Sequence, residues 1–63
     1  MNNTYEVVMG NEVVETIQQQ GRCEHTMSFI IMESVYALVR KFKVSGDNIE
    51  VYNRTTGQVH RHV

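Results

Sequence analysis

Two short pairs of residues in this chain have side chains that suit metal chemistry. Cys23 and His25 are two positions apart, and so are His60 and His62. Residues two apart in an extended chain point to the same side, so each pair could supply two ligands. One cysteine with three histidines is a suitable tetrahedral set for zinc. The spacing matches no established zinc signature, and surface histidines with a buried free cysteine are the simpler interpretation. We therefore predict no metal and no cofactor, and keep the zinc set as the alternative.

No other group of residues suggests catalysis. Cys23 and His25 are too close along the chain to form the thiol–imidazole pair of a nucleophilic enzyme. The four glycines are isolated at expected turns and form no phosphate-binding loop. The carboxylates are scattered over faces that we expect to be solvated. We therefore predict that the protein is not an enzyme.

The charges of the chain are divided by sign along its length. Residues 1–39 contain five glutamates and one arginine, a net charge of −4. Residues 40–63 contain five basic residues and two acidic ones, a net charge of +3. Two halves that pack together would complement one another, and the alternative is a basic C-terminal surface for an acidic partner. The overall net charge of −1 argues against a polybasic nucleic-acid binder.

A basic and aromatic group in the C-terminal half is the predicted partner-binding surface. Strand alternation would place much of this group on the side of a sheet that faces away from the core. Such a face suits a protein partner, because tyrosine and arginine dominate the energetics of protein interfaces. It would also suit a phosphate backbone. The predicted residues are Tyr52, Arg54, Lys41, Lys43, His60 and Arg61.

The strongest structural pattern lies in residues 26–42, where apolar residues recur at helical spacing. We predict one helix there, with Thr26 or Ser28 as its N-cap. Its apolar positions cover an arc of about 200°, roughly twice what one sheet face can cover. We therefore predict that the chain is a homodimer whose interface contains Phe29, Met32 and Tyr36. The alternative is that residues 5–17 cover this arc within a monomer.

The segments on either side of the helix are predicted to be mainly extended. Residues 3–9 are rich in β-formers and predict a strand. Residues 12–20 are ambiguous between a short helix capped by Asn11 and a second strand after a Gly10–Asn11 turn. The three glutamines lead us to favour the helix.

From Lys43 onward the apolar pattern has a period of two, beginning with the alternation of residues 41–44. We expect a turn at 45–48, a strand at 49–53, a loop at 53–57 with Gly57 left-handed, and a last strand at 58–63. The helix would cover the Ile49, Val51 and Val59 side of this sheet. The predicted fold is α+β, a single domain of residues 1–63. It consists of an N-terminal strand and one long amphipathic helix packed on a small C-terminal antiparallel sheet.

Part of this pattern is similar to a known family of small dimeric repressors. A strand, residues 12–20, Gly21 and a longer helix with the pattern Ser28-x-x-Ile31-x-x-Ser34-Val35 resemble the ribbon-helix-helix fold over residues 3–40. That family reads DNA with a basic N-terminal ribbon, whereas the strand here has no lysine or arginine. The resemblance implies a dimeric nucleic-acid-binding transcriptional regulator, which is the alternative function.

The size of the chain leads to the preferred function. A domain of 63 residues has a small core and often depends on a partner. The first residues predict no signal peptide, the apolar region 27–42 is interrupted by three charges, and the cysteine is single. These features predict a cytoplasmic protein without a membrane partner. We expect a small non-catalytic interaction protein, such as an inhibitor or adaptor of phage or mobile-element type, that binds a protein partner sterically.

Overall fold

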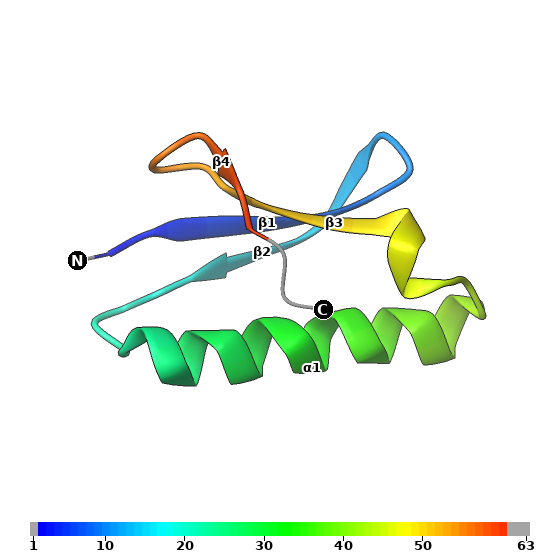
Figure 1. The fold of residues 1–63 in the computed structure, drawn as a ribbon, viewed down its shortest axis with the longest axis horizontal. Helices are drawn as coiled ribbons and strands as arrows, with labels where there is room; N and C mark the ends of the chain where they lie inside the picture. The colour runs from blue at the N-terminus through cyan, green and yellow to red at the C-terminus, as the bar shows by residue number, and fades with distance from the viewer. Residues whose placement is uncertain (1, 61–63) are drawn as a thin grey trace.

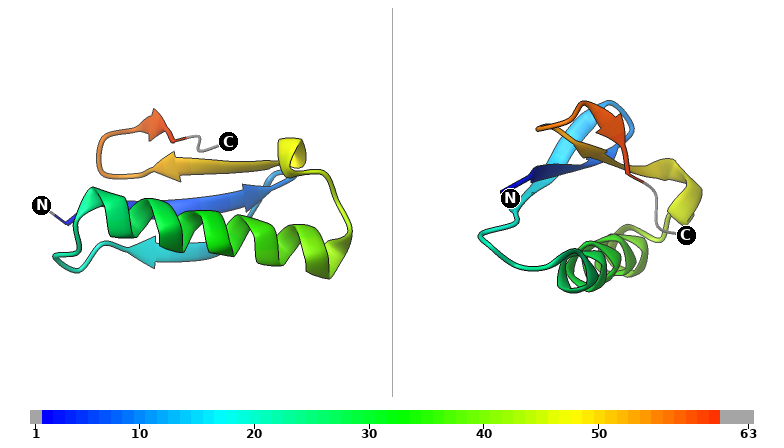
Figure 2. Two further views of the ribbon diagram at one scale, coloured as in Figure 1. Left: turned by 60° about the horizontal axis from the view of Figure 1, so that its bottom comes forward. Right: turned by 60° about the vertical axis from the view of Figure 1, so that its left-hand side comes forward.

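The computed structural model describes residues 2–60 as a four-stranded antiparallel sheet with one long helix against one of its faces (Figure 1). The predicted α+β class is confirmed. The two layers are seen from further sides in Figure 2. The strands lie in the order β2-β1-β3-β4, so that β1 is central. In chain order the elements are β1 (Thr4–Met9), β2 (Glu12–Gln18), α1 (Glu24–Phe42), the 3-10 helix η1 (Gly46–Asn48), β3 (Ile49–Asn53) and β4 (Gln58–Val59).

The first two strands form a hairpin about Gly10 and Asn11. Gly10 has a φ of 68°, a left-handed conformation that costs glycine little. The ladder between β1 and β2 is antiparallel throughout. Our preferred prediction of a helix over residues 12–20 is therefore wrong, and the alternative second strand is confirmed. Four β-branched residues favour the extended chain, and pairing with β1 satisfies its backbone groups: Val13, Val14, Thr16 and Ile17.

Because residues 12–18 form a strand, the chain does not have the ribbon-helix-helix fold that its sequence resembles. That fold needs two helices after its strand, whereas residues 12–18 here are paired in the sheet. In the described part of the chain α1 is the only α-helix. The predicted two-helix arrangement is therefore wrong.

The β1–β2 ladder contains a bulge. Val7 lies opposite Glu15, whereas its neighbour Val8 lies opposite Val13, so Val14 is the extra residue. As a result Glu15 shares the helix-facing side of the sheet with Val7. Its carboxylate accepts a hydrogen bond from the Ser34 hydroxyl of α1, which ties the edge strand to the helix.

The predicted helix is confirmed, and it begins two residues earlier than expected, at Glu24. Its N-cap is Cys23, whose side chain makes no capping hydrogen bond, so the prediction of Thr26 or Ser28 as the cap is wrong. The helix ends at Phe42, where Lys43 adopts a left-handed φ of 55°. The alternation expected at 41–44 is therefore helix and connecting loop, not strand. Among the described residues, no helix has both the length and the apolar character needed to cross a lipid bilayer.

The C-terminal turns follow the prediction closely. The Ser45 hydroxyl accepts a hydrogen bond from the Asp47 N–H at the start of η1. In the next loop the Asn53 side-chain oxygen accepts from the backbone of Thr55 and Thr56, and Gly57 has the expected left-handed φ of 76°. The last strand is shorter than predicted, because β4 ends at Val59 and residues 61–63 lie outside the described part.

The N-terminal strand and the C-terminal strands belong to one sheet. The central strand β1 pairs with β3 over five positions, from Tyr5–Asn53 to Met9–Ile49. The core lies between this sheet and α1. Its buried hydrophobic side chains are Tyr5, Val7, Ile17, Met27, Ile31, Val35, Ile49 and Val51.

Val59 was predicted to face the helix, and this prediction is wrong. Val59 lies opposite Tyr52 in the ladder between β3 and β4. Tyr52 is on the other side of the sheet from its buried neighbour Val51, which faces the helix. Val59 is 57% exposed, in agreement with a position on the far side of the sheet. The length of the preceding loop sets this register, and a change of one residue exchanges the two faces of a strand.

Replacing Ile31 with alanine tests the core. Ile31 is fully buried between the helix and the sheet, so its truncation should lower the free energy of unfolding by about 2–5 kcal/mol. Urea unfolding followed by circular dichroism measures this loss. Ser28→Ala is the control on the same helix, because Ser28 is exposed, is not one of the predicted dimer residues, and should change stability by less than about 1 kcal/mol. Equal losses in the two variants would contradict the assignment of the core face.

Candidate interaction surfaces

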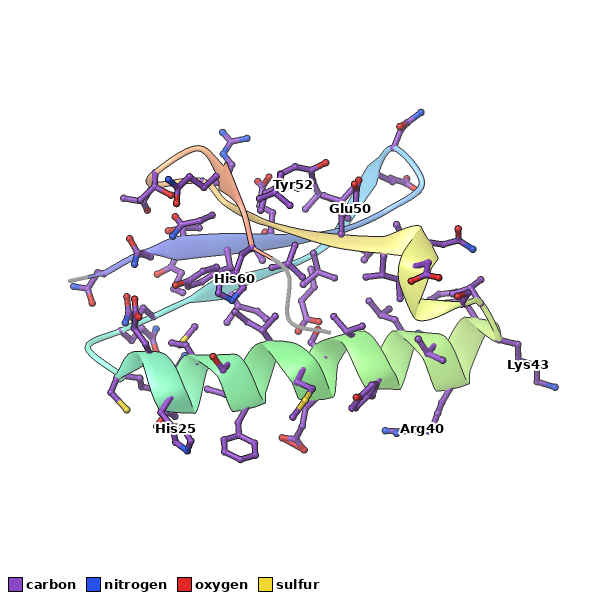
Figure 3. All side chains as sticks on the ribbon, viewed as in Figure 1. His25, Arg40, Lys43, Glu50, Tyr52 and His60 are labelled. Atoms are coloured by element: carbon purple, nitrogen blue, oxygen red, sulfur yellow. The ribbon has the colours of Figure 1, made fainter. Side chains whose placement is uncertain are left out.

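Among residues 2–60, no helix or strand covers the side of the sheet that faces away from α1, and we call this side the outer sheet face. Strand alternation places on it the residues that lie between the buried ones of β1 and β3. The side chains of Glu50 and Tyr52 point away from the helix in Figure 3. The outer sheet face consists of Glu6, Val8, Val13, Thr16, Glu50, Tyr52 and Val59.

Tyr52 lies near the middle of the outer sheet face. It is paired with Glu6 on one side and with Val59 on the other. Its hydroxyl donates a hydrogen bond of 2.9 Å to the Glu50 carboxylate. This hydrogen bond raises the pKa of the Tyr52 phenol above the ordinary tyrosine value, because the neutral phenol is the donor. Tyr52 is therefore a neutral aromatic ring held in place by a neighbouring carboxylate.

Arg54 lies at the end of β3, beside the outer sheet face. Its guanidinium is 3.5 Å from the Glu6 carboxylate, in a solvent-exposed ion pair. An exposed pair of this kind contributes about 0–1 kcal/mol to stability. The contact thus orients the arginine more than it stabilises the fold.

The second uncovered surface is the side of α1 that faces away from the sheet. Phe29 is 53% exposed and Tyr36 is 51% exposed, whereas Met32 between them is half-buried. The His25 ring meets the Phe29 ring edge-on, with centroids 5.2 Å apart. We call these four residues, His25, Phe29, Met32 and Tyr36, the outer helix stripe. The predicted dimer residues are therefore together on one exposed face, and their contact with a second copy stays a prediction.

The six predicted partner-binding residues do not share one surface. Tyr52 and Arg54 lie on or beside the outer sheet face. Lys41 is helical, with its ammonium 5.3 Å from the Phe42 ring centroid, and Lys43 ends the helix. Figure 3 shows Lys43 at the far end of α1. The predicted strand alternation failed here because the helix continues through Phe42.

His60 lies on the opposite side of the sheet from Tyr52. Its ring meets the Tyr5 ring with centroids 5.2 Å apart, and Tyr5 belongs to the core. The prediction that His60 faces away from the core is therefore wrong. Its N–H pairs with the Val51 carbonyl, which places it in register with a helix-facing residue. Arg61 lies outside the described residues.

The geometry on which the zinc alternative depended is not present at its first pair. Cys23 and His25 lie at the start of α1, where residues two apart point in different directions rather than to one side. Cys23 is exposed, so the interpretation as a buried cysteine is wrong as well. Within residues 2–60, no three histidine, cysteine, aspartate or glutamate side chains are grouped so as to hold a metal ion. His62 lies outside these residues.

Sequence reasoning missed Val13 and Val59 as apolar residues of the outer sheet face. Val8, Val13 and Val59 flank the polar residues there, and Val13 and Val59 are 48% and 57% exposed. Strand alternation in β1 predicts the side of Val8, because Val7 and Met9 on either side of it face the helix and Val8 must therefore face away. The bulge at Val14 concealed Val13, because it shifts the alternation by one position.

Comparison of the chain with protein-family models, with curated proteins and with solved structures finds no match. The arguments about function therefore depend on the two uncovered surfaces.

Cys23 offers a direct test of the local geometry at the start of α1. Its sulfur lies 3.3 Å from the Thr26 hydroxyl, and this hydrogen bond is the main reason that the pKa of the Cys23 thiol is lowered. A lower pKa means more thiolate at a given pH. In Thr26→Val, the pH dependence of alkylation by iodoacetamide should shift to higher pH. Cys23 is the only cysteine, so the rate reports this site alone. Ser28→Ala is the control; identical profiles for Thr26→Val and the unchanged protein would contradict the assignment.

Proposed function

We propose that this chain is a small non-catalytic protein that binds a protein partner through the outer sheet face and acts as a homodimer. The observation that carries this proposal is that both outer sides of a two-layer fold expose apolar side chains. Val59 and Val13 are exposed on the sheet side, and Phe29 and Tyr36 on the helix side. Exposed apolar groups bordered by polar residues are typical of protein interfaces.

The outer sheet face has the composition of a surface that binds another protein reversibly. Tyrosine and arginine are enriched among the residues that contribute most to binding, and here Tyr52 is paired with Glu6 in the sheet while Arg54 forms an ion pair with the same glutamate. Val8 and Val59 supply apolar area around them, while the glutamates supply a polar border. The hydrogen bond from Tyr52 to Glu50 fixes the ring before binding, which reduces the conformational entropy lost in the complex.

The proposed mechanism is steric. The sheet would cover a working surface of the partner, as an inhibitor or adaptor does, and no bond would be made or broken. The rigid support for this face is the central pairing of β1 with β2 and β3, with α1 packed behind it. A cytoplasmic partner remains part of the proposal.

A protein partner fits the outer sheet face better than a nucleic acid does. The charged groups on the outer sheet face are the carboxylates of Glu6 and Glu50. Arg54, at the border of this face, forms an ion pair with Glu6. A phosphate backbone requires unpaired positive charge on the binding face. The basic residues Arg40, Lys41 and Lys43 are at the end of α1 instead.

A photo-crosslinking amino acid at position 59 tests the partner-binding face in the native cells. Val59 is 57% exposed, so the substitution should leave the fold unchanged. We expect a crosslink to one protein, with a yield that falls at least fivefold when Tyr52→Ala is added. The same probe at the exposed Asn48, in η1, is the matched control and should not capture that protein.

Two results would contradict the proposal. One is a crosslink whose yield does not change with Tyr52→Ala. The other is binding to nucleic acid in a gel shift at about 50 mM salt that disappears as the salt is raised, since this dependence marks phosphate contacts.

A further inference from the structure

Strand β2 is at one edge of the sheet, and part of its backbone faces away from β1 (Figure 2). The Gln19 N–H donates to the Asn3 carbonyl, on the side of β1. Successive residues of a strand direct their backbone groups to opposite sides, so Gln18 and Thr16 direct theirs to the free edge. Both residues are exposed. They therefore present N–H donors and carbonyl acceptors that the pairing with β1 does not use.

The bulge at Val14 ends this regular run of backbone groups. The pairing of Val8 with Val13 makes Val13 the next residue that faces the free edge, three positions before Thr16 instead of two. A regular strand bonds to every second residue of its neighbour. An added strand could therefore pair with Thr16 and Gln18, but not with Val13 as well.

The Arg22 side chain blocks the other end of the run. Its Nη2 donates a hydrogen bond of 2.6 Å to the Gln18 carbonyl. Because the donor is charged, this bond is stronger than one between neutral groups. The backbone of Arg22 is fixed by the buried Gln19, which accepts from the Arg22 N–H and whose side-chain amide donates to the Arg22 carbonyl. The guanidinium is thus held over the free edge by the connection between β2 and α1.

This position of Arg22 is not the one that would stabilise the fold most. Within residues 2–60, the Nε–H of Arg22 is buried and has no hydrogen-bond acceptor. A buried donor without an acceptor lowers stability. Strand β2 itself contains no proline, lysine or arginine, the residues that commonly protect an edge from pairing with another chain. Arg22 supplies the missing positive charge from outside the strand.

We propose that Arg22 prevents β2 from pairing with the β2 strand of a second copy. Two β2 strands complement one another when they lie antiparallel about a twofold axis at Ile17. Thr16 of each copy then lies opposite Gln18 of the other, and each of these two pairs exchanges two backbone hydrogen bonds. The Gln18 carbonyl accepts one bond in each pair. These are the carbonyls that Arg22 already occupies.

The charges of β2 do not prevent this pairing. In the same register Glu15 lies opposite Gln19 of the other copy, so the carboxylates of the two strands do not face one another. The bulge limits the length of the pairing, and Arg22 removes part of what remains. The inference does not depend on the proposed homodimer or on the outer sheet face, because each variant below is compared with the unchanged protein.

Arg22→Gln tests the block by its effect on self-association. Glutamine is polar but too short to reach the Gln18 carbonyl, and the backbone bonds of residue 22 to Gln19 remain. In sedimentation velocity we expect the variant to associate at least roughly tenfold more strongly than the unchanged protein, the effect of the two bonds that become free to form. Lys41→Ala is the control, because it also removes one exposed positive charge, in the last turn of α1, and should sediment as the unchanged protein does.

Amide hydrogen exchange locates the association. In the unchanged protein the N–H groups of Thr16 and Gln18 should exchange rapidly, whereas Ile17, which is paired with Tyr5, should exchange slowly. In Arg22→Gln, Thr16 and Gln18 should become protected as the concentration rises. Adding Thr16→Pro removes one donor from the free edge and should restore the sedimentation of the unchanged protein. Proline is tolerated on an edge strand where the N–H faces solvent.

Circular dichroism of each variant verifies the fold. Stronger association of Arg22→Gln that protects Thr16 and Gln18 and is reversed by Thr16→Pro supports the inference. A folded Arg22→Gln variant that sediments as the unchanged protein overturns it. So does association that leaves these two amides exchanging rapidly, or that persists with Thr16→Pro. Slow exchange of both amides in the unchanged protein overturns it without any variant, because the edge would then not be free.

Discussion

One sheet face can contact only one side of a helix, and this constraint shapes the whole molecule. The buried side of α1 carries Met27, Ile31 and Val35 against the sheet. The opposite side carries Phe29 and Tyr36, which no other element in the described chain covers. Two layers are all that a chain of this size forms here, so the apolar excess of the helix remains at the surface. Burial of that excess in a second copy, as in the proposed homodimer, would be favoured by the hydrophobic effect.

The central position of β1 explains how so small a core is held together. Both its neighbours pair with it along nearly its full length, and its buried Tyr5 and Val7 lie under the helix. The strand thus links the N-terminal hairpin to the C-terminal hairpin across the long helix. The same pairing sets the outer sheet face, because every residue between two buried ones must point to the other side. The core and the proposed partner-binding face are therefore fixed by one set of hydrogen bonds.

The proposed interaction surfaces were predictable to different degrees. The stripe of Phe29, Met32 and Tyr36 follows from helical spacing alone, because a helix of known phase leaves no freedom in which residues share a side. The sheet face did not follow in the same way. Tyr52 was placed on it correctly, whereas Val59 and His60 were exchanged between its two sides. A strand has only two sides, so an error of one residue in register is enough to reverse them.

The sequence by itself determined the elements that depend on neighbours along the chain: the helix through Phe42, and the left-handed turn at Gly57. Helical spacing and glycine conformation are local properties, and no distant contact is needed to predict them. Only the tertiary structure decided that residues 12–18 are a strand, since their glutamines and β-branched residues support either state until β1 supplies the pairing. It also decided that the basic residues are divided among the helix end, the core side and the outer sheet face. That division depends on which side of the C-terminal strands α1 covers, and this is set by the pairing of β1 with β3 and by the packing of α1, between segments far apart in the sequence.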